Sequence, residues 1–133
     1  YGKAEWIAKG EDIAILAEGH MLDAAYGAVE RLRAEGKNPS LVNIRFIRPL
    51  DGEILRAVAE NCSHIFTVED NVRDGGFGSA VLEFYSDHDI AANVKNLAFP
   101  DEYIEQGTQA QLFAKYGLDA EGIYQSIKKT LGE

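Results

Sequence analysis

The stretch from residue 64 to residue 82 constrains the fold more than any other part of this chain. It passes from an apolar, mostly β-branched run at residues 65–68 through Glu69 and Asp70 and three glycines into a segment with helical spacing. This order is typical of a strand, a tight loop and the beginning of a helix. Glycines at such a turn allow positive φ or a close approach, and the free N–H groups of the helix attract negative charge. The loop is therefore a candidate functional site.

Strand-like and helix-like segments alternate along the rest of the chain. Apolar runs bounded by turn residues predict strands at 3–8, 13–17, 41–47, 64–68 and 94–99. Apolar spacing of three and four predicts helices at about 20–35, at 51–59, after Gly78, at about 109–115 and from Asp119 onwards. The first strand is predicted to lie at an edge and the second at the centre. The alternation indicates an α/β fold, with a parallel sheet, helices on both faces and right-handed crossovers.

Caps and buried faces follow from the same patterns. Asp51 and Asp119 each precede a helical pattern, so their carboxylates are predicted to accept hydrogen bonds from the first free N–H groups. Pro49 ends the strand before Asp51, because proline donates no ladder hydrogen bond and keeps Arg48 extended. The inward face of the first helix is predicted to comprise Leu22, Ala25, Tyr26, Val29 and Leu32, and that of the last helix Ile123, Ile127 and Leu131. The third helix carries the apolar residues Val81, Leu82, Phe84 and Tyr85.

Composition limits the class of protein. With 133 residues, 46% hydrophobic and 26% charged, residues 1–133 are predicted to form one soluble domain without a membrane-spanning run. The net charge of -9 opposes binding to nucleic acid and to anionic membranes. Cys62 is the single cysteine, which excludes an internal disulfide and favours a reducing, cytoplasmic compartment. The first residue is Tyr1 rather than methionine, which indicates a piece of a longer protein.

The glycine loop fits none of the common ligand-binding motifs. A dinucleotide fingerprint counted from Gly76 ends on Val81 instead of glycine or alanine, and the loop lacks the lysine of a P-loop. A calcium loop beginning at Asp70 would place Val72 at a ligand position. Ser79 lies outside a nucleophile-elbow pattern, and the three histidines are scattered as capping or surface residues usually are. We therefore predict no catalytic, cofactor-binding or metal-binding residue.

Longer stretches resemble a known family. Lys-Gly-Glu-Asp-Ile-Ala-Ile-Leu at 9–16, Arg-Phe-Ile-Arg-Pro-Leu-Asp at 45–51 and Val-Glu-Asp-Asn at 68–71 with the glycine loop resemble the C-terminal domain of transketolase-like, thiamine-diphosphate-dependent enzymes. Phe-Pro-Asp-Glu-Tyr-Ile-Glu-Gln-Gly at 99–107 and Tyr-Gly-Leu-Asp-Ala-Glu-Gly-Ile at 116–123 are most similar to the 1-deoxy-D-xylulose-5-phosphate synthases among them. The similar segments come in the family's order and cover essentially the whole chain.

The resemblance implies a three-layer α/β/α domain whose five-stranded, mostly parallel sheet has an antiparallel first strand at its edge. The full enzymes use thiamine diphosphate and Mg²⁺ to condense pyruvate with glyceraldehyde 3-phosphate, releasing carbon dioxide, for isoprenoid and thiamine biosynthesis. Their cofactor residues lie in two preceding domains, so the resemblance transfers no catalytic residue to this chain, and the isolated fragment is expected to be inactive. The last domain supports the other domains and helps to form a homodimer. The implied interface or structural-loop residues are Arg48, Asp51, Glu69, Asp70, Asn71, Gly75, Gly76, Phe77 and Gly78.

The residues leave alternatives open. The chain could be the C-terminal part of a transketolase or of a 2-oxo acid dehydrogenase beta subunit that docks a partner, although the segments at 100–105 and 117–123 argue against it. It could also be an autonomous module that holds a phosphorylated metabolite where a helix begins at residues 75–79. Glu69 and Asp70 bear on this second alternative. Carboxylates at the end of a strand either contact a ligand or, more commonly, cap a helix or form ion pairs.

Overall fold

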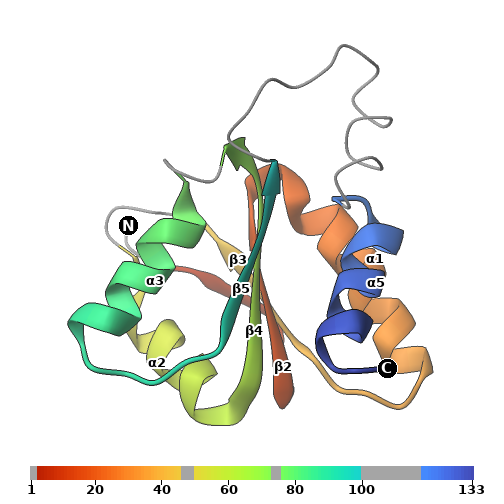
Figure 1. The fold of residues 1–133 in the computed structure, drawn as a ribbon, viewed down its shortest axis with the longest axis horizontal. Helices are drawn as coiled ribbons and strands as arrows, with labels where there is room; N and C mark the ends of the chain where they lie inside the picture. Colours follow the sequence, from red (N-terminus) through yellow and green to blue (C-terminus); the bar gives the residue numbers. More distant parts are fainter. Residues whose placement is uncertain (1–2, 46–49, 73–75, 100–117) are drawn as a thin grey trace.

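A mixed five-stranded sheet forms the centre of the computed structural model, which describes residues 3–45, 50–72, 76–99 and 118–133 (Figure 1). The strands are β1 (Glu5–Ala8), β2 (Asp12–Glu18), β3 (Ser40–Ile44), β4 (Cys62–Val72) and β5 (Val94–Phe99). They lie in the order β1-β3-β2-β4-β5, with β1 antiparallel to β3 and every other pair parallel. The predicted edge position of the first strand and the central position of the second are confirmed.

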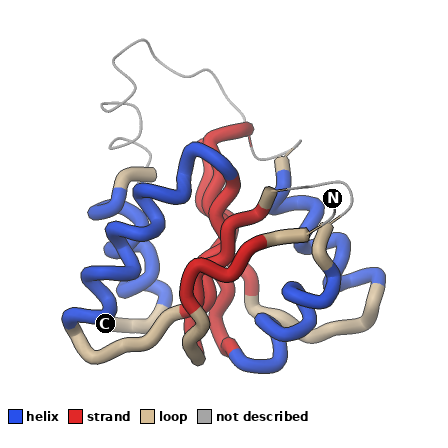
Figure 2. Tube along the Cα trace, turned by 180° about the vertical axis from the view of Figure 1, so that it is seen from behind, coloured by secondary structure: helices blue, strands red, loops and turns tan. Residues whose placement is uncertain are grey.

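Helices cover both faces of the sheet. In the described part of the chain they are α1 (Leu22–Ala34), α2 (Gly52–Asn61), α3 (Phe77–Asp87) and α5 (Ala120–Thr130), with the short 3-10 helix η1 (Gly19–Met21) before α1. Figures 1 and 2 show α1 and α5 on one face and α2 and α3 on the other, so the predicted three-layer α/β/α architecture is confirmed. The helix predicted near residues 109–115 lies outside the described residues. None of the described helices has the length and apolar character that crossing a lipid bilayer requires.

Strand β2 contributes to two separate cores. Its residues 13–17 are all buried, and successive side chains of a strand point to opposite faces of the sheet. Alternate β2 residues therefore pack against α1 and α5 on one face and against α2 and α3 on the other. The residues that β2 contributes are Ile13, Ile15 and Ala17 to the first core, and Ala14 and Leu16 to the second. This double coverage explains why the strand reads as an unbroken apolar run.

Tyr26, which was predicted to face inward, is on the surface, and so is Leu82 of α3. Tyr26 is 46% exposed and Leu82 is 44% exposed. The buried stripes run instead through Ala25, Ala28, Val29 and Leu32 of α1, and through Phe77, Gly78, Val81 and Tyr85 of α3. Each exposed residue directly follows a buried one and is therefore turned by about 100° from it around the helix axis. The prediction was wrong because it gave weight to the large apolar side chain and overlooked the small Ala28.

The boundaries of two strands also differ from the predicted ones. Strand β4 begins at Cys62 and continues to Val72, so Glu69 and Asp70 belong to the strand and not to a turn after it. Strand β3 ends at Ile44, three residues before the predicted end, and residues 46–49 lie outside the described part of the chain. The longer β4 places Glu69 inside the sheet, where its side chain faces the helical layer.

Candidate functional site

The carboxylate of Glu69 occupies the beginning of helix α3. Its Oε1 accepts a hydrogen bond from the Phe77 N–H at 3.0 Å, and its Oε2 accepts one from the Gly78 N–H at 2.7 Å. Glu69 is only 1% exposed. The first N–H groups of a helix have no partner within the helix, and the helix dipole favours negative charge at this end. One buried side chain thus satisfies two backbone donors through charge-assisted hydrogen bonds.

Two features of β4 direct Glu69 toward α3: the alternation of side-chain direction along the strand and an irregularity in its pairing with β5. Phe66 and Val68 belong to the core under α1 and α5, so Thr67 and Glu69 point to the face that α2 and α3 cover. Beyond Val68 the pairing of β4 with β5 is irregular. From Val68 to Val72, β4 advances by four residues, while its partner β5 advances by only two, from Leu97 to Phe99. Such an irregularity bends a strand and changes the direction of its side chains. The local backbone therefore positions the carboxylate under the helix.

Two glycines make room for this carboxylate. A Cβ atom on Gly76 would lie 1.7 Å from Oε1 of Glu69, and a Cβ on Gly78 would lie 2.9 Å from Oε2 of Glu69. The Gly78 Cβ would also come within 2.8 Å of Cγ of Asn96. The backbone of Gly76 is extended, with φ -97° and ψ -176°, so this residue does not use positive φ. Gly76 and Gly78 are needed for close approach, which is one of the two reasons for glycine that the sequence allowed.

Thr67 and Asn96 extend the polar cluster into the sheet. They face each other across β4 and β5, and the fully buried Thr67 hydroxyl donates a 2.6 Å hydrogen bond to Oδ1 of Asn96. Sequence reasoning missed both residues. A signal was present, because two polar residues, Thr67 and Glu69, follow the buried Ile65 on the same face of β4. The partner strand could not be identified from the sequence alone.

Asp51 forms a separate cap on helix α2. Its Oδ1 accepts a hydrogen bond from the Ile54 N–H at 3.3 Å, and its Oδ2 accepts one from the Ala4 N–H at 2.9 Å. The side chain is 7% exposed. The predicted cap is confirmed, and the second bond also ties the segment before β1 to α2. Asp119 likewise caps α5, by accepting a hydrogen bond from the Gly122 N–H at 2.8 Å.

The other residues of the predicted interface loop divide into three groups. Phe77 is fully buried in the core under α2 and α3, so it anchors α3 and is not a surface contact within this chain. Asp70 and Asn71 lie in β4, but their side chains are not described. Arg48 and Gly75 lie outside the described residues. The structure therefore brings together Glu69, Gly76, Phe77 and Gly78 and keeps Asp51 at another helix.

The beginning of α3 does not fit a phosphate ligand. In doubly wound sheets, ligands bind at the carboxyl ends of the strands where the strand order reverses, which here is between β2 and β4. The N–H groups that would receive a phosphate are already bound to the buried carboxylate of Glu69. A diphosphate placed there would meet that negative charge at close range. The described residues also contain no group of three or more His, Cys, Asp or Glu side chains that could hold a metal ion.

Two other groups that could carry chemistry are held protonated. Burial raises the pKa of the Cys62 thiol, which disfavours the nucleophilic thiolate. Burial also raises the pKa of Tyr85, whose hydroxyl donates a 2.7 Å hydrogen bond to the Leu55 carbonyl. Both residues thus stabilise the contact between α2, α3 and the sheet.

The fold and the site together define a doubly wound α/β domain. It has an antiparallel edge strand, and Glu69 of β4 caps its helix α3. The chain belongs to the family of transketolase C-terminal domains, which matches residues 2–123. It is 47% identical over 127 residues to a 1-deoxy-D-xylulose-5-phosphate synthase of Syntrophotalea carbinolica, covering 96% of this chain and 20% of that protein. A second such synthase, of Caldanaerobacter subterraneus, is 44% identical over 126 residues, covering 95% of this chain and 20% of that protein.

Solved structures agree with this membership. A split-gene transketolase described as an inactive beta4 tetramer has a TM-score of 0.89 and 30% identity, covering 98% of this chain and 43% of that one. A transketolase variant from Pichia stipitis shares the fold. It has a TM-score of 0.72 and 18% identity, covering 98% of this chain and 18% of that one.

The chain spans about 20% of the length of the curated relatives, so it corresponds to one domain of a larger enzyme. Transketolases and 1-deoxy-D-xylulose-5-phosphate synthases depend on thiamine diphosphate. Neither a dehydrogenase beta subunit nor a phosphometabolite module is favoured.

Proposed function

We propose that this chain is the C-terminal domain of a transferase that makes 1-deoxy-D-xylulose 5-phosphate from pyruvate and glyceraldehyde 3-phosphate, releasing carbon dioxide. The observation that carries the proposal is the 47% identity to a synthase of that name over 96% of the chain. The whole enzyme uses thiamine diphosphate with Mg²⁺ and acts in the cytoplasm, where it supplies isoprenoid and thiamine biosynthesis. The free Cys62 thiol is compatible with a reducing compartment.

The role of residues 1–133 in that enzyme is structural. They form one domain that contacts the domains holding the cofactor and contributes to a homodimer. The capping of α3 by Glu69 supports this role, because the edge at which related folds bind ligands is used here to fix a helix. The split-gene transketolase that shares this fold is described as a tetramer, which supports assembly through chains of this kind. We expect the contact surface to lie around Arg48 and around residues 70–75, because Asp51, Glu69 and residues 76–78 are buried within this chain.

The experiment is an assay of the full-length enzyme with pyruvate and glyceraldehyde 3-phosphate, in which product formation requires added thiamine diphosphate and Mg²⁺. Xylulose 5-phosphate with ribose 5-phosphate serves as the matched transketolase reaction. We expect product only in the first reaction. Transketolase activity, or activity that appears only with a partner acyltransferase, would contradict the assignment.

A second measurement tests the structural role. Residues 1–133 are removed from the full-length enzyme, and activity and oligomeric state are measured together by assay and light scattering. We expect loss of both. Full activity of the shortened enzyme would contradict the proposal, and so would micromolar binding of thiamine diphosphate and Mg²⁺ to the 133-residue chain alone.

A further inference from the structure

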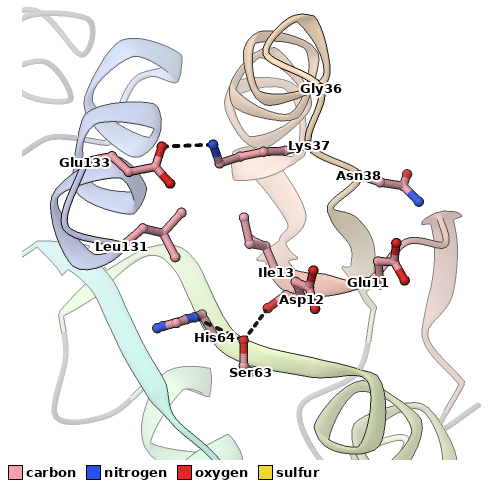
Figure 3. Close-up of a pocket in the computed structure, with 10 residues that line it drawn as sticks. All are labelled: Glu11, Asp12, Ile13, Gly36, Lys37, Asn38, Ser63, His64, Leu131 and Glu133. Atoms are coloured by element: carbon pink, nitrogen blue, oxygen red, sulfur yellow. Dashed lines mark hydrogen bonds and ion pairs between the residues drawn. The ribbon is translucent and has the colours of Figure 1, made fainter.

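A pocket of about 420 Å³ lies at the opposite edge of the sheet from Glu69 (Figure 3). It is formed where β2 and β4 begin, together with the loop after α1 and the end of the chain after α5. Its volume is in the range of pockets that bind small molecules, about 300–1,000 Å³. Four segments that are distant in sequence converge on it. The pocket is independent of the site under α3 and of the function proposed above.

The walls of the pocket combine apolar surface with fixed polar groups. Ile13, which is 4% exposed, and Leu131 provide the apolar part. The Ser63 hydroxyl donates to the Asp12 carbonyl oxygen at 3.2 Å and lies 3.3 Å from Nδ1 of His64. The first of these bonds ties the beginning of β4 to the beginning of β2, as Figure 3 shows. A ligand would thus meet an apolar wall on one side and an ordered polar rim on the other.

The charges around the pocket are not balanced. Lys37 is the one lysine among the described residues that line the pocket. Its Nζ is already paired with two carboxylates, at 2.9 Å from Glu133 Oε1 and 3.7 Å from Glu35 Oε1. The carboxylates of Glu11 and Asp12 form no ion pair with any residue in the described part of the chain. Asp12 also has a φ of 69°, a left-handed conformation that aspartate tolerates better than most residues. The lining therefore carries excess negative charge beside an apolar wall.

We propose that this pocket binds a small organic cation, a protonated amine with a short apolar body. The ammonium group is held by the carboxylates of Glu11 and Asp12. The apolar body lies against Ile13 and Leu131. Anions are disfavoured, because the lining lysine is neutralised by its own carboxylate partners. A neutral molecule of the same shape gains the apolar contact but not the ionic one.

The test is calorimetric titration of the full-length protein with three molecules of similar shape: benzylamine, benzyl alcohol and benzoate. We expect one benzylamine per chain at this pocket, weaker binding of benzyl alcohol and no binding of benzoate. Glu11→Gln and Asp12→Asn each remove one charge, and asparagine tolerates the left-handed conformation at position 12. Each substitution should weaken benzylamine binding by about fivefold, on the order of one exposed ion pair. Glu83→Gln removes the same charge from the exposed surface of α3 and should change nothing.

Three results would each overturn the proposal. The first is the absence of benzylamine binding, and the second is equal binding of benzyl alcohol. The third is an equal effect of Glu83→Gln and of the pocket variants, which would show that only the net charge of the protein attracts the amine. Thermal melts of all variants verify folding, and Glu11→Gln alone decides the outcome if Asp12→Asn does not fold.

Discussion

Replacing Gly76 with alanine should destabilise this domain severely, because the new methyl group and the Glu69 carboxylate need the same space. The Cβ would lie 1.7 Å from Oε1, 2.5 Å from Cδ and 2.9 Å from Oε2 of Glu69. Because real Cβ atoms almost never come within 3.0 Å of another heavy atom, the Glu69 side chain must move, and its burial and its two hydrogen bonds make that movement costly. The carboxylate must leave the beginning of α3. It then loses its hydrogen bonds from the Phe77 and Gly78 N–H groups.

The size of the loss follows from these two bonds. A hydrogen bond to a charged group contributes about 1.5–3 kcal/mol, so the two together stabilise the fold by about 3 kcal/mol or more. Strain does not add to this figure, since the extended backbone of Gly76 is open to alanine. The expected decrease in the free energy of unfolding is therefore about 3 kcal/mol, a large part of the total stability of an ordinary domain.

The assay is urea denaturation of the 133-residue chain, followed by circular dichroism and by the fluorescence of Trp6, its single tryptophan. Gly52→Ala is the matched control. Gly52 is the first residue of α2, whereas Gly76 directly precedes α3, and a Cβ on Gly52 would meet only the movable Phe84 ring at 3.2 Å. The control should change the free energy of unfolding by less than about 0.5 kcal/mol, as most surface substitutions do. Equal stability of Gly76→Ala and wild type would refute the assigned role of the Glu69 cap.

Two further predictions concern the contact between α1 and α5. Gly27→Val should cost about 1–3 kcal/mol in the same denaturation assay, because a Cβ on Gly27 would lie 2.8 Å from Cβ of Ala120 and overpack the helix contact; an unchanged midpoint would contradict it. Hydrogen bonds from Lys128 and Lys37 lower the pKa of Glu133 from its usual 4.5 to about 2, so the stability it contributes is present above pH 4.5 and lost as the pH falls toward 2. Melting temperatures across that window should depend less on pH in Glu133→Gln, and identical pH profiles would show that the pairs do not stabilise the fold.

The fold could be predicted from local patterns because each element carries its own signal. The unbroken apolar run at residues 13–17 indicated a strand covered on both faces, and Asp51 and Asp119 indicated helix caps. The antiparallel direction of the first strand came only from the resemblance to the family. The buried face of α1 was mispredicted, because Ala28 is buried there and Tyr26 is not. The close approach of another helix decides which side chain fits at this face.

The site could be predicted only in part. Capping was the favoured interpretation of Glu69, and the three glycines marked the right loop. The sequence could not show that Glu69 binds two N–H groups, because those groups lie eight and nine residues away and are reached through a strand irregularity. The pairing of Thr67 with Asn96 depends on which strands are neighbours. That information belongs to the tertiary structure and not to any local pattern.

The direction of β1 determines where this domain is tethered. Glu5 pairs with Asn43 and Ala8 with Leu41, so the first residues of β1 lie at the carboxyl ends of the parallel strands. The bond from the Ala4 N–H to Asp51 holds the chain at that edge. Any polypeptide that precedes β1 therefore arrives beside the beginnings of α2 and α3, and the amino edge with its pocket faces away from the tether. One strand of four residues thus orients the whole domain relative to what it is attached to.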